Sequence, residues 1–209
     1  GFSYWADLSG NIFNGIFDGM GYTISGLKVG DGGMFGNVID GTIRNVSLVD
    51  IYAYGKGENS AVTINNGGSN ILAQMMSGTV ENVFVSGSAA SQDGWYSGLV
   101  YDADGATFTN CVFDVELRGS LESWDAPMGL LRTNTYSNVV FLNDSGRVYT
   151  NHTGNAYSTS SPDATNFRVY ADVAAAVAGE EFGFGSFTKD GSGNILFNGE
   201  VVVAAEVTE

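Results

Sequence analysis

Acidic side chains are the residues of this chain best suited to chemistry, since Asp and Glu supply 23 of its 209 residues. Asp102 and Asp104 alternate just before Gly105, which is how a calcium-binding loop begins. The later oxygen ligands and the terminal Glu of such a loop are missing, and ordinary turn chemistry explains the same residues. The sequence offers Asp102 and Asp104 as candidate metal ligands. It predicts no cofactor, with calcium left open.

Carboxylates can also act as general acids and bases on sugars, where a hydrolase needs two or three converging carboxyl groups and a lyase needs a base. The acidic residues that could gather on one face of the fold are Asp102, Asp104, Asp114, Glu116, Glu122 and Asp125. Only Glu116 has a basic neighbour on the same strand face, Arg118. Solvated surface charge explains the others. We therefore expect no catalytic residues and no enzyme, with a polysaccharide lyase or glycoside hydrolase as the rival reading.

Aromatic residues in polar stretches give a third candidate site. Trp95 and Tyr96 lie 28–29 residues before Trp124, so they could stack on neighbouring turns of a repeat and form a strip. Tyr52 and Tyr54 fall in a similar context. Flat aromatic faces stack on sugars, although large aromatics also pack under loops. Trp95, Tyr96 and Trp124 are the candidate ligand-binding residues, with a glycan or a surface protein as the partner.

An internal repeat must position these residues. Four segments share the pattern Thr, apolar, variable, Asn, small apolar, variable, large apolar: 42–48, 79–85, 107–113 and 135–141. Their asparagines Asn45, Asn82, Asn110 and Asn138 are separated by 37, 28 and 28 residues, and a further step of 28 reaches Asn166. Residues 23–29 fit the pattern with Gly26 in the Asn position. Such periodicity is typical of stacked repeat architectures.

The Asn position indicates a bend between two strands, because Asn and Gly tolerate the left-handed backbone region best. Apolar residues two before, one after and three after the bend would then face one interior. Short apolar segments precede each bend, at 34–36, 71–73, 99–101 and 129–131. Two or three short strands per turn predict a parallel β-helix. Stacked turns would align Asn45, Asn82, Asn110, Asn138 and Asn166 in an internal amide ladder.

Residues 13–27, 33–36 and 41–48 resemble the opening of GLUG-type repeat proteins, most closely over residues 12–50 and more loosely to 146. These are bacterial surface and secreted proteins with a right-handed, pectate-lyase-like β-helix. The resemblance implies that fold, an extracellular or cell-surface setting, and adhesion or surface display. Similar β-helices occur in phage fibres, so a virion surface or fibre protein is an alternative.

From residue 147 onward, the sequence no longer follows the repeat closely. Asp172–Gly179 predicts a short helix with Asp172 as N-cap and Gly179 as C-cap, and 186–197 predicts a hairpin around an Asp-Gly turn. We expect an all-β, right-handed parallel β-helix of about five to six turns with a small C-terminal α/β cap. Residues 1–146 would hold the repeats, and residues 147–209 the final turns with a cap or assembly region.

The amino-acid composition limits which classes of partner the protein is expected to bind. The formal charge of −15 and the dispersed Lys and Arg argue against nucleic acid. No run of 18 apolar residues exists, so no membrane insertion is expected. The single cysteine, Cys111, excludes an internal disulfide and occupies a position filled by Val in other repeats. The sequence predicts a non-enzymatic, adhesin-like extracellular structural and binding module, able to self-assemble through its coil ends.

Overall fold

Each copy of the repeat forms one long strand that bends at its asparagine. In the computed structural model, which describes residues 3–4, 10–30, 32–54, 69–91, 98–119, 125–142, 146–151, 157–180 and 182–205, the φ angles of Asn45, Asn82, Asn110 and Asn138 lie between 52° and 54°. These left-handed residues interrupt the two-residue alternation of the strand. The expected bend is confirmed at all four positions.

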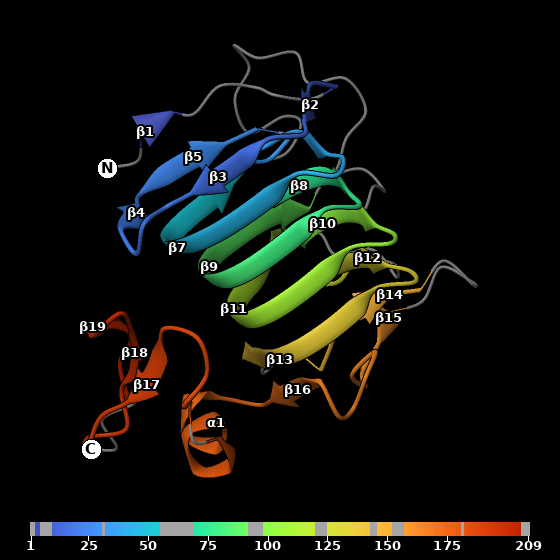
Figure 1. The fold of residues 1–209 in the computed structure, drawn as a ribbon. Helices are drawn as coiled ribbons and strands as arrows, with labels where there is room; N and C mark the ends of the chain where they lie inside the picture. The colour runs from blue at the N-terminus through green and yellow to red at the C-terminus, as the bar shows by residue number, and fades with distance from the viewer. Residues whose placement is uncertain are drawn as a thin grey trace.

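The long strands stack in parallel into a nine-stranded sheet, sheet A, along which successive turns of the chain follow one another from top to bottom (Figure 1). Its path runs through β1 (Ser3–Tyr4), β5 (Leu27–Val29), β7 (Thr42–Ala53), β9 (Thr79–Ser91), β11 (Thr107–Gly119), β13 (Thr135–Leu142) and β16 (Phe167–Tyr170), with β3 (Ile16–Asp18) and β4 (Thr23–Ser25) also paired to β7.

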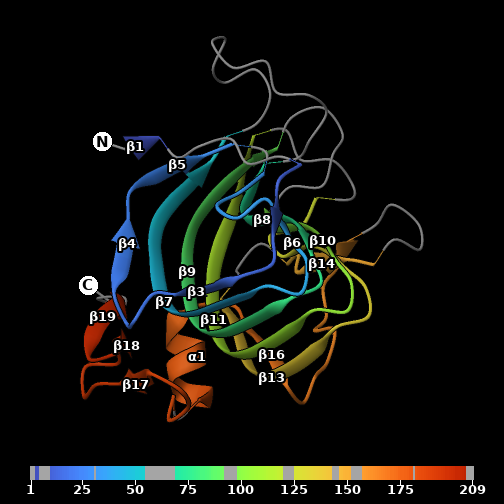
Figure 2. The ribbon, with the colours of Figure 1, turned by 45° about the horizontal axis from the view of Figure 1, so that its top comes forward.

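The shorter strands of each turn form the opposite wall, a seven-stranded sheet B (Figure 2). Its strands are β2 (Ile12–Phe13), β6 (Asn37–Val38), β8 (Asn70–Met76), β10 (Gly98–Ala103), β12 (Gly129–Leu131), β14 (Tyr149–Thr150) and β15 (Tyr157–Ser158). All the sheet B pairings are parallel except that of β14 with β15. The two walls make a parallel β-helix, or β-solenoid, which confirms the expected fold class.

Four turns of this solenoid are regular, fewer than the five or six expected. Each regular turn consists of one strand of sheet B followed by one strand of sheet A: β6 and β7, β8 and β9, β10 and β11, and β12 and β13. The first coil is divided into the short strands β2 to β5, and the last coil has only short strands, β14 and β16. The periodicity of the sequence predicted full turns at both ends, because Gly26 and Asn166 occupy the Asn position of the repeat.

The interior of the solenoid is apolar and follows the predicted pattern. Residues two before, one after and three after each bend are buried in one core: Ile43, Val46, Leu48, Val80, Val83, Val85, Phe108, Cys111, Phe113, Tyr136, Val139 and Phe141. Cys111 is fully buried in this column, and burial raises the pKa of its thiol to about 12. Its role as a buried hydrophobic residue is therefore confirmed.

Two Asn–Asn bonds of the expected ladder exist, but they lie outside the solenoid core, at the bends. Asn82 Nδ2 donates to Asn45 Oδ1 at 2.9 Å, and Asn138 Nδ2 donates to Asn110 Oδ1 at 3.0 Å. The expectation of an internal ladder is wrong because a left-handed residue turns its side chain away from the core that its neighbours fill. Asn138 is exposed.

The ends of the ladder also differ from expectation. At the first coil, Asn45 Nδ2 donates to Asp18 Oδ1 at 3.1 Å. The N–H of Met20 and the Asn45 amide hold the pKa of the Asp18 carboxyl below its usual value. At the other end, Asn166 follows Asn138 in register but lacks a positive φ, and its side chain donates to Asp163 Oδ2. Asn166 is therefore not a member of the ladder.

The tail forms a C-terminal module made of α1 (Val173–Gly179) and the antiparallel sheet C, with strands β17 (Phe187–Lys189), β18 (Ile195–Phe197) and β19 (Glu200–Val203). Asp172 caps the helix by accepting the N–H of Ala175 at 2.7 Å, as predicted, whereas the C-cap is Glu180. The hairpin β17–β18 is confirmed.

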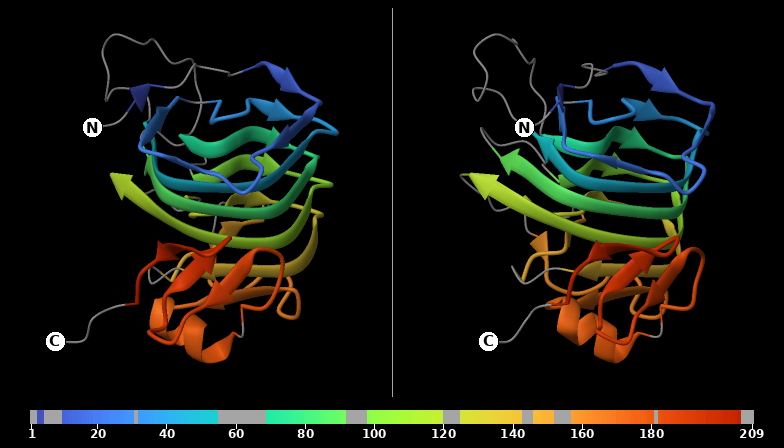
Figure 3. Two further views of the ribbon diagram at one scale, coloured as in Figure 1. Left: turned by 60° about the vertical axis from the view of Figure 1, so that its left-hand side comes forward. Right: turned by 90° about the vertical axis from the view of Figure 1, so that its left-hand side faces the viewer.

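The C-terminal module packs against the side of the solenoid as well as its lower end, which corrects the idea of a simple end cap (Figure 3). The residue two positions after the bend points outward, and in β9, β11 and β13 it is Phe84, Val112 and Val140. These side chains form a second apolar core with residues of the module: Ala176, Phe182, Phe187, Ile195 and Phe197.

The same module reaches the ladder and the first coil. Asn82 Oδ1 accepts the Ser186 N–H at 2.7 Å, and a Cβ on Gly185 would lie 2.5 Å from that oxygen. Gly185, with φ at 55°, fits there because it has no side chain. Asn198 Nδ2 lies 3.5 Å from the carbonyl oxygen of Gly21 in the first coil. The module thus contacts turns that are far apart along the solenoid.

The first coil carries strongly exposed apolar side chains, among them Ile12, Ile16, Met20 and Tyr22. Self-assembly through the coil ends stays a prediction. Within the described residues, no helix has the length and hydrophobicity that a membrane span would require.

We predict that replacing Asn110 separates backbone strain from the ladder hydrogen bond. Asn110→Ala should lower the free energy of unfolding by about 2 kcal/mol, because alanine disfavours a positive φ and the bond with Asn138 is lost. Asn110→Gly should cost about 1 kcal/mol less, since glycine adopts this conformation freely. Urea denaturation measures both values. Equal costs would contradict the role of the left-handed bend.

We predict that in Phe84→Ala the C-terminal module detaches from the solenoid and loses its structure while the solenoid stays folded. Removing this fully buried ring should cost about 3–4 kcal/mol and abolish amide protection in β17–β19. Val83→Ala is the matched control, because its side chain points into the solenoid core and should lower protection in β7–β11 instead. Hydrogen exchange measured by mass spectrometry distinguishes them. Unchanged protection of β17–β19 in Phe84→Ala would contradict the packing described here.

Candidate functional site

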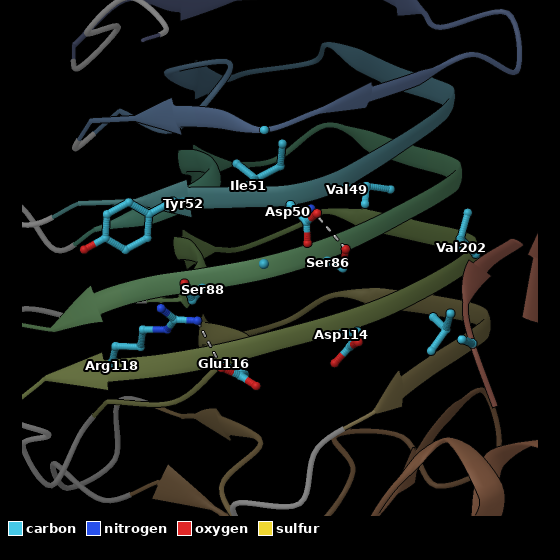
Figure 4. A pocket seen from close by; sticks show the side chains of 14 residues that line it. Val49, Asp50, Ile51, Tyr52, Ser86, Ser88, Asp114, Glu116, Arg118 and Val202 are labelled. Atoms are coloured by element: carbon cyan, nitrogen blue, oxygen red, sulfur yellow. Dashed lines mark hydrogen bonds and ion pairs between the residues drawn. The ribbon is translucent and has the colours of Figure 1, made fainter. Parts of the chain in front are cut away.

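A hollow of about 610 Å³ lies on the outer face of sheet A, between the second halves of its long strands and the edge of sheet C (Figure 4). We call it the lateral groove. Its floor comes from β7, β9 and β11, and one wall comes from Val202, Val203 and Ala204. The polar and charged lining residues are Asp50, Tyr52, Ser86, Ser88, Asp114, Glu116 and Arg118.

Strand register places these side chains in two columns that cross the turns. In one column, Tyr52 of β7 lies opposite Ser88 of β9, which lies opposite Glu116 of β11. In the other column, Ser86 lies opposite Asp114, and the Asp50 N–H donates to Ser86 Oγ at 3.3 Å. Parallel strands lie about 4.8 Å apart, so each column repeats at that spacing.

Two local irregularities shape the floor. The register of β7 against β9 shifts between Leu48 and Ile51, and Asp50 within this bulge has a φ of 55°. A bulge re-aims a side chain, and here it leaves Asp50 exposed over the groove. At Gly87 the backbones approach so closely that a Cβ would lie 2.0 Å from the Ile51 carbonyl oxygen. Only glycine fits at this place.

The charged side chains of the groove are accessible to a ligand from solvent. Arg118 lies 3.7 Å from Glu116, and both side chains are about two-thirds exposed. An ion pair of this kind contributes little to stability, so it can exchange for a ligand group. Above the groove, the Lys28 ammonium lies 5.2 Å from the centre of the Tyr52 ring and 4.9 Å from that of Tyr54. These contacts are cation–π interactions.

The predicted metal ligands lie elsewhere, in β10 and the turn after it on the opposite wall. Both carboxylate oxygens of Asp102 accept hydrogen bonds from Arg132, at 2.8–3.1 Å, and the Asp102 side chain is only 10% exposed. Asp104 Oδ1 accepts the Thr133 N–H at 3.3 Å. The loop is therefore organised around an ion pair, and a calcium ion would have to displace the guanidinium.

The acidic candidates that the structure describes do not gather on one face, contrary to the arrangement considered from the sequence. Asp102 and Asp104 belong to the sheet B wall, Asp114 and Glu116 to sheet A, and Asp125 is buried before β12. Within the described residues, no group of three or more His, Cys, Asp or Glu side chains could hold a metal ion. Glu122, Trp95, Tyr96 and Trp124 lie outside the described residues, as does His152.

Sequence reasoning identified the Glu116 and Arg118 face but missed the groove. Asp50 could have been found from the extra residue between the ladder Asn45 and Tyr52, which marks a bulge when the repeats are aligned. The wall could not be found, because Val202 lies almost 90 residues beyond Asp114 and no repeat connects them. Loops and tails place such distant residues together only through packing.

Comparison with known protein families, characterised proteins and solved structures finds no match to this chain. Its class therefore rests on the architecture: a parallel β-solenoid with a laterally packed C-terminal module and a groove between them. The resemblance to GLUG-type repeats stays a prediction.

We predict that calcium leaves the wild-type protein unchanged, because Arg132 occupies both oxygens of Asp102. Millimolar calcium should not raise Tm relative to magnesium. Arg132→Ala should lower the free energy of unfolding by about 2 kcal/mol, since it leaves a mostly buried carboxylate without its partner. Differential scanning calorimetry measures both effects. A rise of the wild-type Tm with calcium alone would contradict this account of the loop.

Proposed function

We propose that this chain is a non-enzymatic, adhesin-like binding module that works outside the cell, with the solenoid as a rigid frame and the lateral groove as its ligand site. The observation that supports it most is the groove itself. Polar and charged side chains from three successive strands meet there in a hollow with an apolar wall, so one ligand can reach both convergent polar groups and an apolar surface.

The rigidity of the frame supports the same proposal. Side chains on packed strands are held more firmly than side chains on loops, so a site built on β7, β9 and β11 is preorganised. The resemblance to surface and secreted repeat proteins supports the extracellular setting. A fold by itself does not determine function, so the proposal depends on the site.

An enzyme is the rival, and one observation favours it. Asp114 and Glu116 stand two residues apart on the same face of β11, so their Cα atoms are separated by about 7 Å. Glycosidases use a pair of carboxyl groups that flank the scissile bond. Binding without turnover distinguishes a binding module from such an enzyme.

The experiment exposes the protein to neutral, acidic and cationic polysaccharides and to immobilised matrix proteins. Surface plasmon resonance measures binding, while reducing-end and unsaturated-product assays measure turnover. We expect binding of at least one probe without product, and a loss of about tenfold in affinity in Glu116→Gln. Glu81→Gln is the matched control, since Glu81 is an exposed carboxylate of β9 on the other side of the bend.

Two results would contradict the proposal. Product formation that disappears in Asp114→Asn or Glu116→Gln, but persists in Glu81→Gln, would make the protein an enzyme acting in the groove. Binding that is equal in the wild type, Glu116→Gln and Asp114→Asn would place the ligand site outside the groove.

A further inference from the structure

We propose that the lateral groove accepts an extended, positively charged polypeptide segment, which adds to the edge of β19 as a further strand. This inference rests on the proposed function, because it names the ligand class of the same groove. Strand addition uses the main chain for affinity and the side-chain positions for selectivity. The wall, the floor and the direction of the groove each support it.

The wall is the edge of a sheet. Within the described residues, β19 pairs with β18 alone, so it is an outer strand of sheet C. Val202 and Val203, the last residues of β19, line the groove together with Ala204, which follows the strand. The end of this outer strand therefore borders the hollow.

This edge has some of the features that limit pairing and lacks others. Outer strands are usually protected by short length, a bulge, lysine, proline or a covering segment. β19 has four residues, and its register against β18 shifts between Val201 and Val203. Residues 200–205 read Glu-Val-Val-Val-Ala-Ala, with neither lysine nor proline, and three β-branched residues favour further strand formation. Val201 is more than half exposed. An outer strand that borders a hollow and carries no lysine or proline can receive a short further strand.

The floor selects for positive charge. Asp50, Asp114 and Glu116 give the groove three carboxylates, and Arg118 is the one guanidinium among the described lining residues. The lining residues therefore carry a formal charge of −2, and the Lys28 ammonium over the Tyr52 ring brings the local charge to −1. The chain as a whole carries −15. An anionic ligand would be repelled, whereas lysine or arginine side chains would be attracted.

The direction of the groove fits an extended chain. Figure 4 shows the segment that carries Val202 beside the bends of the long strands, with a course transverse to theirs. A strand paired with that segment would also cross the turns, over the column of Asp50, Ser86 and Asp114. Alternate side chains of an extended peptide repeat at about 6.8 Å, and flexible lysine stems can reach carboxylates on turns spaced by about 4.8 Å.

A glycan is the less favoured ligand of this groove. Sugar recognition would use a stacking aromatic face, and Tyr52 is the one aromatic among the described lining residues. The Lys28 ammonium already lies over its ring. A strand edge, in contrast, spaces its backbone donors and acceptors in the same way as another extended polypeptide.

The test uses the full chain and a fluorescein-labelled peptide of about ten residues in which lysine and threonine alternate. Fluorescence anisotropy gives Kd at low and physiological salt. The matched probes are the same peptide N-methylated at alternate residues, an alternating glutamate–threonine peptide, spermine, a chitosan oligosaccharide and a neutral cello-oligosaccharide. The protein variants are Asp114→Asn and Glu116→Gln, with Glu81→Gln as control and circular dichroism to check folding.

We expect the lysine–threonine peptide to bind with a Kd that rises with salt, since exposed charges are screened within about 8–10 Å. N-methylation and the glutamate sequence should each weaken binding by about tenfold or more, because they remove backbone donors and charge complementarity respectively. Asp114→Asn should weaken it by about fivefold, and Glu81→Gln should leave it unchanged.

Other outcomes overturn the inference and separate it from the proposed function. If spermine or chitosan binds as tightly as the peptide and N-methylation has no effect, strand addition is wrong while the groove stays a ligand site. If the neutral oligosaccharide binds in a manner that depends on Glu116 and the peptide does not bind, the ligand is a glycan. If no probe binds and the polysaccharides and matrix proteins of the preceding experiment also fail, both proposals are wrong.

Discussion

The left-handed asparagine at each bend is the constraint on which the rest of this structure depends. A straight strand would alternate without interruption, so its apolar residues two before and one after the bend would face opposite sides. The positive φ of Asn45, Asn82, Asn110 and Asn138 restores both residues to the same interior. The strand can then turn a corner while its backbone continues to pair with the turns above and below.

The same bend prepares the outer surface for the C-terminal module. It places the asparagine amides in a row outside the core, and it turns the residue two positions later outward. The module uses both features. The Ser186 N–H donates a hydrogen bond to the Asn82 amide oxygen, and the phenylalanines of the module pack against Phe84. The groove exists because β19 is held beside strands whose second halves it does not cover. A repeat that builds the core therefore also determines where the hollow lies.

The fold could be predicted from the sequence because the residues that face the interior repeat with a regular spacing. The residues of the candidate site do not repeat in this way. Cys111 could be assigned to the core from the valines at equivalent positions, and the Asp172 cap could be assigned from local chemistry. The side on which the ladder runs could not be predicted, since asparagine accepts either environment when its amide is satisfied. Nor could the pairing of Asp102 with Arg132, which are 30 residues apart on adjacent turns.

The contrast between the two faces of sheet A bears on function. Inward positions of β7, β9 and β11 hold the same class of residue on every turn, but the outward positions over the groove do not. Tyr52, Ser88 and Glu116 occupy one column and are aromatic, small and acidic in turn. A surface that served only to stack turns would favour like residues, whose side chains pack against each other along the column. The outward column before the bend also changes from turn to turn, with Arg44, Glu81, Thr109 and Ser137, so the outer face of sheet A varies wherever it does not build the core.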